Sequence, residues 1–505
     1  MTITIPYVLL QMVAVPLFFS VVVFALGGRI GKRVGWIAFA SLLYTTILMV
    51  LVGIGLFNGT QQQVSENYVW APVAGLNFGF LADNLSLPVA LVMNIVVTAT
   101  SVYSMDYMKH RIEVMYGEEK KGQYSLYFIN FMLLDAGLIG VALATNLIEL
   151  YLFVELMLIP SAFMVALFGY TNRERTAIMY FLWNHLGAFI FFAGIILAYI
   201  GTKSFEISSL GGLQAGTLAY WAAGLILLGW LVKMAVFGVH MWLPTAHAEH
   251  PTSFAPFIVT IVGVGNYVVV RLLVQGMPTV FAPFAFPLMV VALVTMVYGG
   301  ILTMVQTDVK YLYAWSTISQ NAYSLLGIGS LSLLGVSGGI FYFLNHIIGK
   351  TILFCVAGIL ISQVGTRDMR KMGGLAAKMP VTATLCVLGS MILSAVPPTG
   401  GFQGEWILFA GVFSRGTTGP LGWNFVVAIF GIAATILTVA YTFWPLRRMF
   451  FGALPTELAQ VKEAPLTMTV PLLALAALSI VIGIYPDLFF RFLYHYASML
   501  PLGGP

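Results

Sequence analysis

Apolar stretches of about 20 residues recur along nearly the whole chain and are separated by short polar segments. Of its 505 residues, 60% are hydrophobic and 8% are charged, whereas a soluble domain carries about 25% charged residues. Hydrocarbon cannot satisfy backbone polar groups, so a spanning segment of this kind must be helical. We therefore expect an all-α integral membrane protein with about fourteen transmembrane helices.

Two of these helices are expected to be broken. Pro244 interrupts the segment that contains helix seven, and helix twelve carries PPTGG at 397–401. Proline removes a helical hydrogen bond and clashes with the preceding turn. The expected helices cover 5–26, 35–57, 85–105, 124–144, 147–169, 176–200, 216–243, 252–275, 282–305, 309–328, 336–362, 380–414, 423–446 and 467–490.

Basic residues are concentrated in alternate loops. Most of the 23 Lys and Arg residues fall in the loops that the expected helices place on one side of the membrane. These loops include 27–33, 106–123 and 365–378. By the positive-inside rule that side is cytoplasmic. We expect a multi-pass protein of a prokaryotic cell membrane with both termini outside. The run 5–26 has no basic region before it, so we expect a first span there and no signal peptide.

An internal repeat is visible in the sequence. Residues 176–197 resemble 338–360, and LGWLVKMAV (228–236) resembles LGSMILSAV (388–396). An odd number of spans separates the copies, so we expect two inverted repeats of about five helices each, as in secondary transporters; chance similarity is the alternative. The expected divisions are 1–123 (helices 1–3), 124–275 (first repeat, helices 4–8), 282–446 (second repeat, helices 9–13) and 467–505 (helix 14).

Lys233 lies inside an apolar run, where a charge costs roughly 2.5 to 3.5 kcal/mol to insert. Glu155 lies well inside the fifth expected helix. If the two approach, each stabilises the charged state of the other, and separating them would release the lysine's proton. His240 follows Lys233 by almost two helical turns, so the two would share a helix face; His247 comes after Pro244. A snorkelling lysine or a static ion pair is the alternative.

Further polar residues fall in the second half of the chain. His346 and Lys350 are spaced to share one helix face, and imidazole is a natural proton relay; a histidine satisfied by a carbonyl is the alternative. Glu405 follows the PPTGG break, and unwound backbone inside a bilayer is tolerated where it lines a wet cavity. We expect Glu405 to be an end site for protons.

Four secondary candidates complete the set. His185 occupies in the first copy the place of His346 in the second, and Asp135 lies in the middle of helix four. Glu149 and Asp308 lie at helix starts, where a carboxylate can complement the helix dipole.

We expect no cofactor and no metal on this chain. Cys355 and Cys386 lie in separate apolar runs and cannot supply the four thiolates of an iron–sulfur cluster. Nucleotide-binding glycine motifs and HExxH do not occur, and HAEH (247–250) is a weak metal signal. The net charge of +5 is explained by loops facing anionic lipid, so we expect no nucleic-acid partner.

With these residues in view, the chain resembles the antiporter-like subunits of respiratory complex I and its relatives over nearly its whole length. The stretches that carry the resemblance are ELMLIP (155–160), VKMAVFGVHMWLPTAHAEHPTS (232–253), QTDVKYLYAWSTISQNAYSLLG (306–327), NHIIGK (345–350) and GGFQGEWILF (400–409). The pattern is most similar to the subunit M (subunit 4) type and also resembles the D subunit of Mrp-type antiporters and the equivalent subunits of membrane-bound hydrogenases.

The resemblance implies a proton pathway through Glu155, Lys233, His346 with Lys350, and Glu405. It also implies homologous membrane subunits as partners, with flavin, iron–sulfur or nickel–iron centres on other subunits. The chain departs from the family at two positions: Ala235 stands where a proline usually follows the lysine, with Gly238 nearby, and Gly263 stands where helix eight often carries a basic residue. Water, Asn266 or a neighbouring helix would have to replace that basic group.

Three functions remain open from the sequence. The first is a subunit of a redox-driven complex that translocates protons, or sodium ions in exchange for protons. The second is a component of a redox-independent Mrp-type cation/proton antiporter, or the hydrogenase version of the subunit. The third is a membrane scaffold whose polar residues only fix helix packing.

Overall fold

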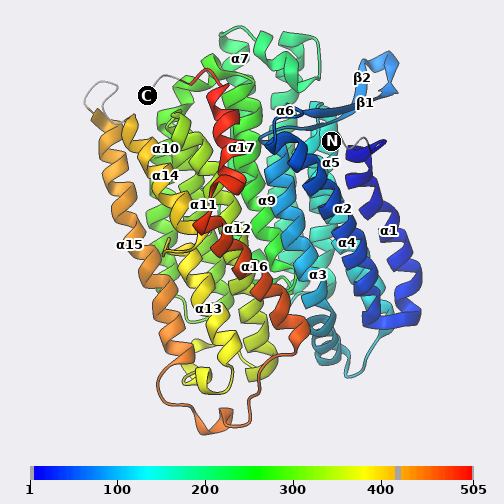
Figure 1. Ribbon diagram of the computed structural model, residues 1–505, viewed down its shortest axis with the longest axis vertical. Helices are drawn as coiled ribbons and strands as arrows, with labels where there is room; N and C mark the ends of the chain where they lie inside the picture. Colours follow the sequence, from blue (N-terminus) through cyan, green and yellow to red (C-terminus); the bar gives the residue numbers. More distant parts are fainter. Residues whose placement is uncertain (1–4, 416–421, 503–505) are drawn as a thin grey trace.

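The computed structural model describes residues 5–415 and 422–502 as a bundle of long helices with a small β-hairpin at one end (Figure 1). Within those residues, ten helical stretches have the length and apolarity needed to cross a membrane. The loop charges predict that both chain ends lie on the outer side of the membrane. Those ends, residues 1–4 and 503–505, lie outside the described residues. The helical membrane fold expected from the apolar runs is confirmed, and the count of about fourteen crossings stays a prediction.

The helices of the first half are α1 (Val8–Ile30), α2 (Val34–Phe57), α3 (Ser86–Tyr116), α4 (Lys121–Leu143), α5 (Leu147–Phe168), α6 (Arg173–Thr202), α7 (Thr217–Lys233), α8 (Trp242–Glu249) and α9 (Ala255–Val268), which continues as a π-helix to Gln275. Those of the second half are α10 (Pro278–Met304), α11 (Val309–Gly329), α12 (Leu333–Val364), α13 (Pro380–Leu393), α14 (Gly400–Ser414), α15 (Trp423–Phe450), α16 (Leu466–Ile484) and α17 (Asp487–Ser498).

Three parts of the structure differ from the sequence-based expectation. Pro244 does not make the first break, because it lies in the first turn of α8 and α7 already ends at Lys233. The polar segment after α2 forms an antiparallel hairpin of β1 (Val64–Ala71) and β2 (Leu76–Ala82), so the chain is not entirely helical. The last expected helix ends at Ile484, and α17 begins after Pro486. Proline disfavours a helical conformation in the residue before it, which explains the interruption.

The two interior breaks have the same local structure. α7 ends at Lys233 and α13 ends at Leu393, and each is followed by an alanine, Ala235 or Ala395, with φ of 53° or 51°. The Val236 amide donates to the Leu231 carbonyl at 3.2 Å, and the Val396 amide donates to the Met391 carbonyl at 2.9 Å. Both helices therefore unwind in the same way at positions that the sequence repeat aligns.

A second set of hydrogen bonds also recurs along the chain. The Leu147 amide donates to the Phe205 carbonyl, and the Val309 amide donates to the Arg367 carbonyl. The partner bonds, Ile207 to Thr145 and Met369 to Thr307, lie at the same spacing. Figure 1 places the 203–216 connection at the end that carries the β-hairpin, and the 365–379 connection at the opposite end. An inverted repeat requires this arrangement.

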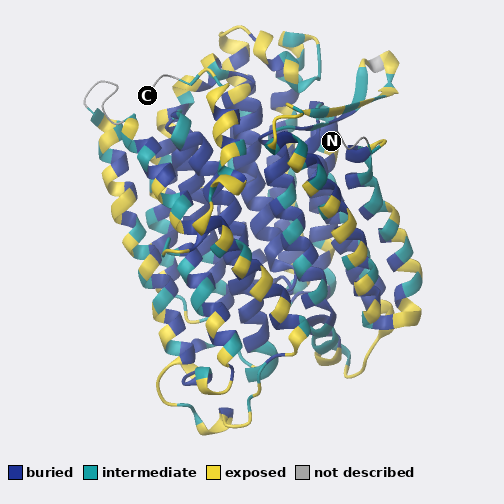
Figure 2. Cartoon of the chain, in the orientation of Figure 1, coloured by how far each residue is buried: buried dark blue, intermediate teal, exposed yellow. Residues whose placement is uncertain are grey.

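The core is centred on α9 and α12. Every residue of α9 is buried, whereas exposed residues line the outer faces of α1 and α15 (Figure 2). α6 and α7 cross closely at two glycines: a Cβ on Gly229 would lie 2.6 Å from the Gly187 carbonyl oxygen. Small residues allow such approach between membrane helices, and this contact brings the end of α7 beside α6.

Candidate functional site

The break after α7 keeps its backbone groups satisfied inside the bundle. The Trp242 indole donates to the Val232 carbonyl at 2.9 Å, and the Met234 amide donates to the Trp230 carbonyl at 2.7 Å. Lys233, the last residue of α7, is buried. The carbonyls of a helix C-terminus carry partial negative charge and favour a cation by about 0.3–2 kcal/mol. The break therefore offsets part of the cost of burying this lysine.

Glu155, on α5, lies between two basic groups. Its Oε2 is 3.3 Å from Nδ1 of His185, on α6, and its charge acts on the Lys233 ammonium. His185 packs between the rings of Phe181 and Phe189. The contact with His185 was not expected from the sequence, in which His185 was only a repeat partner of His346. Glu155 can stabilise a proton on His185 or on Lys233.

His240 lies in the unwound segment, because α7 has already ended. The expectation that Lys233 and His240 share a helix face is therefore wrong. The imidazole is buried among the rings of Phe237, Tyr298 and Trp315, with centroids 5.1–5.9 Å away. Its Nδ1 accepts a hydrogen bond from the Gly238 amide at 3.3 Å, so the unwound segment and the aromatic rings hold the imidazole in place.

His247, on α8, is fully buried with no hydrogen-bond partner on either ring nitrogen. Four basic groups act on it electrostatically: His250, Lys310, His346 and Lys350. Among them, Lys310 donates to the His250 carbonyl and lies 4.3 Å from the Tyr170 ring centroid. α8, which follows the first break, therefore contributes His247 to a cluster of basic residues that also comes from α11 and α12.

His346 and Lys350 lie one turn apart on α12, as expected, and both are buried. The Lys350 ammonium donates to the Tyr313 carbonyl at 3.0 Å and to the Ser316 hydroxyl of α11. His346 has no hydrogen-bond partner on either nitrogen. Burial and the adjacent lysine both disfavour a charge on this imidazole, so His346 is neutral in this arrangement.

Gly263 is a packing position. A Cβ there would lie 2.1 Å from Cε2 of Phe343 on α12, so a lysine does not fit. One turn along α9, the Asn266 amide donates to Oδ1 of Asn321 at 2.8 Å, and the Asn321 amide reaches the Met234 carbonyl at 3.4 Å. Two neutral amides therefore connect the α7 break to α11 where a basic side chain was expected.

Glu405 lies on α14, just after the second break, and acts electrostatically on three buried tyrosines from three helices, Tyr323, Tyr342 and Tyr441. Gln320 joins them: it accepts from the Tyr342 hydroxyl and donates to the Tyr441 hydroxyl at 2.7 Å. Thr438 completes the network, 2.8 Å from the Tyr323 hydroxyl. Hydroxyl groups that both donate and accept can pass protons along such a chain.

The remaining candidates have different roles. Asp135 is buried in α4 with neither carboxyl oxygen hydrogen-bonded. Glu149 accepts from the Gly79 amide at 3.1 Å and so ties α5 to the β-hairpin. Asp308 caps α11, as expected, and its Oδ2 lies 2.8 Å from the Arg367 guanidinium. Arg367 also pairs with Glu249 at 3.2 Å.

Sequence reasoning missed two features. Lys310 was not among the candidates, yet it is fully buried at the first turn of α11. The tyrosine network was also missed, because its members come from α11, α12 and α15 and have no common spacing. The polar run STISQNAYS (316–324) inside an expected span was the available signal.

No cluster of three or more His, Cys, Asp or Glu residues with metal-binding geometry occurs within 5–415 and 422–502.

Comparisons with known proteins identify the family. The transmembrane family of NADH:quinone oxidoreductase and Mrp antiporter subunits matches residues 144–438, and the N-terminal family of complex I chain 5 matches residues 70–114. The chain is 29% identical over 500 residues to NAD(P)H-quinone oxidoreductase chain 4 1 of Nostoc sp., covering 95% of this chain and 88% of the relative. It is 27% identical over 469 residues to NADH-quinone oxidoreductase subunit M of Rickettsia typhi, covering 91% and 90%.

The fold is similar to that of a chain in the Mrp complex from Dietzia sp., with a TM-score of 0.86, 21% identity, and coverage of 98% of this chain and 97% of the other. The family match covers more than half of the chain, including the first break, the basic cluster and most of the tyrosine network. The chain therefore belongs to the transmembrane family of NADH:quinone oxidoreductase and Mrp antiporter subunits, and its relatives are of the subunit M, or chain 4, type.

Proposed function

We propose that this chain translocates protons as the antiporter-like subunit of a multisubunit, redox-driven membrane complex related to complex I. One observation carries the proposal: ionisable and hydrogen-bonding groups, partly buried at Glu155 and Glu405 and buried between them, occur on helices from α5 across the bundle to α14. Ionisable residues inside a membrane are costly and are typical of ion pathways.

The pathway begins at Glu155. When His185 is protonated, the Glu155 carboxylate pairs with the imidazolium and stabilises the Lys233 ammonium less, so Lys233 releases its proton. The amides of Asn266 and Asn321, with water, bridge from the α7 break toward α11. Since an amide does not titrate, it orients a proton carrier but does not store the proton.

The basic cluster then receives the proton. His247 and His346 are neutral acceptors without hydrogen-bond partners, and Lys350 is held beside them. Glu405 is the end site, and its charge acts on the tyrosines of the network that Gln320, Tyr342 and Tyr441 form. Redox centres would lie on partner subunits, with homologous membrane subunits alongside.

The basic loops would face the cytoplasm, and the two repeats would be inverted around the breaks. Sodium ions in exchange for protons are the second candidate cargo, because carboxylates and carbonyl oxygens also bind sodium. A redox-independent Mrp-type antiporter is the second candidate assembly, favoured by the fold similarity to the Mrp complex chain. Purification through a tag on this chain separates the assemblies: co-purified flavin, iron–sulfur or nickel–iron subunits exclude the second.

The proposed function is tested with Lys233→Ala in the assembled complex. We expect the variant to assemble but to lose proton translocation, measured with a pH-sensitive dye in proteoliposomes. Lys109→Ala is the matched control, because Lys109 is 43% exposed near the end of α3. If Lys233→Ala pumps like the control, the polar residues serve only as a scaffold.

A further inference from the structure

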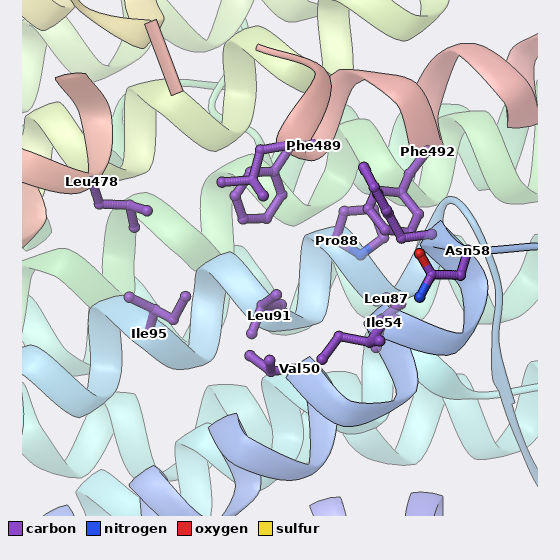
Figure 3. A pocket seen from close by; sticks show the side chains of 13 residues that line it. Val50, Ile54, Asn58, Leu87, Pro88, Leu91, Ile95, Leu478, Phe489 and Phe492 are labelled. Atoms are coloured by element: carbon purple, nitrogen blue, oxygen red, sulfur yellow. The ribbon is translucent and has the colours of Figure 1, made fainter. Parts of the chain in front are cut away.

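We propose that a groove between α2, α3, α16 and α17 binds one acyl chain of an anionic phospholipid whose phosphate lies at Arg491. The groove is separate from the proposed ion pathway, since none of the pathway residues lines it. Its volume is about 380 Å³. Figure 3 shows Phe489 and Phe492 of α17 facing Leu91 of α3 and Val50 of α2 across the opening.

The depth of the groove fits one leaflet. Leu87, Leu91 and Ile95 of α3 line it at four-residue spacing and so share one helix face. Eight residues of helix rise about 12 Å, close to half of the roughly 30 Å hydrocarbon core of a bilayer. The groove therefore has the length of one leaflet's acyl region.

The groove is open to the membrane because its walls carry little bulk. Gly53 of α2 contributes no side chain, and a Cβ there would meet only Leu87, at 3.6 Å. Val50 and Ile54, on the same helix, are 42% and 50% exposed. The apolar side chains that line an empty groove lack dispersion contacts. An acyl chain in the groove supplies those contacts and brings no polar group into it.

Charge at the mouth selects the head group. Asn58 is the polar side chain that lines the groove, at the end of α2. The Arg491 guanidinium lies 4.9 Å from the ring centroid of Phe57, which also lines the groove. Arg491 is exposed and forms no salt bridge with the carboxylates of the described residues. A guanidinium binds phosphate through two parallel hydrogen bonds.

α17 has the character of an interfacial helix. It buries Phe489, Leu493 and Tyr496 and exposes Asp487, Arg491 and His495. Amphipathic helices of this kind lie in the head-group region. The cation at the mouth and the apolar groove below it thus match the two ends of one phospholipid.

The test is photolabelling of the intact complex, purified through a tag on this chain and placed in phosphatidylcholine nanodiscs. The probes are phosphatidylglycerol and phosphatidylcholine, each with a diazirine on one acyl chain. We expect phosphatidylglycerol to label peptides 50–58 and 87–95 about fivefold more than phosphatidylcholine, because the choline cation of phosphatidylcholine offsets the charge of its phosphate, whereas phosphatidylglycerol stays anionic beside the arginine. Arg491→Gln should remove that preference, and Arg491→Lys should keep most of it.

Gly53→Phe should fill the groove and lower labelling by both lipids, whereas Gly28→Phe should not, because Gly28 of α1 has open space around it. Equal labelling by the two lipids in the wild type and both Arg491 variants would mean ordinary surrounding lipid and would overturn the proposal. Absence of label from the groove of the wild-type complex would mean that another subunit covers it, which also overturns it. Ion translocation is measured on the same samples. A failure of the proposed function is therefore distinguished from a failure of the lipid proposal.

Discussion

His185→Ala tests whether the imidazole controls the proton on Lys233 through Glu155. Without His185, the Glu155 carboxylate still acts on the Lys233 ammonium and no longer shares its charge with an imidazolium. Lys233 then retains its proton, and the release step slows. We expect the complex to assemble, since His185 packs at the outer side of α6 with 29% of its side chain exposed.

The magnitude follows from the 3.3 Å separation of Nδ1 and Oε2. Two unit charges at that distance interact by about 5 kcal/mol at an effective dielectric of about 20, which is an upper bound. Desolvation and partial exposure reduce it toward the 1–3 kcal/mol typical of coupling between two sites. Each 1.36 kcal/mol is tenfold in rate, so translocation should fall about 5- to 150-fold.

The assay is dye-detected proton uptake by proteoliposomes holding the complex, with its own redox reaction as the driver. His495→Ala is the control, because this histidine is exposed on α17. If His185 acts through Glu155, the double variant with Glu155→Gln should pump no worse than Glu155→Gln alone. Unchanged pumping by His185→Ala, or a loss that adds to that of Glu155→Gln, would refute this reasoning.

Three other predictions concern packing, the end site and acid stability. Gly263→Lys should lower thermal stability by about 1–3 kcal/mol through overpacking against Phe343; Phe343→Ala should restore part of it in a melting assay, and a stable single variant would contradict the packing reason. Tyr441→Phe removes the hydroxyl that accepts from Gln320 and should slow translocation at little cost in melting temperature; unchanged pumping would remove the network from the pathway. Burial by itself raises the pKa of Asp83, but the charge and hydrogen bonds of Arg271, with the Ser86 and Leu85 amides, outweigh it and hold the pKa below its ordinary value. The stability from this pair is therefore present above the unfolded pKa of about 3.9 and is lost as pH falls through the folded pKa. Asp83→Asn should cost about 3–5 kcal/mol at neutral pH, and melting curves across pH should converge with wild type in acid.

The sequence alone determined the class of fold and most of the candidate residues. Apolar length decides that a segment can cross a membrane, and that property is local. The cost of a charge in hydrocarbon is also local, so Lys233, Glu155 and Glu405 stand out without any contact being known. The i, i+4 spacing placed His346 and Lys350 together on α12 for the same reason.

Only the tertiary structure decided which of these groups meet. The pairing of Glu155 with His185 depends on how α5 and α6 cross, and the tyrosine network depends on three helices that are far apart in the chain. The role of Gly263 was set by the Phe343 ring on another helix. Side-chain contacts between helices depend on crossing angles and small residues, which no spacing along one helix specifies. Lys310 illustrates the same limit: its burial comes from the packing of α8 and Tyr170 against the start of α11.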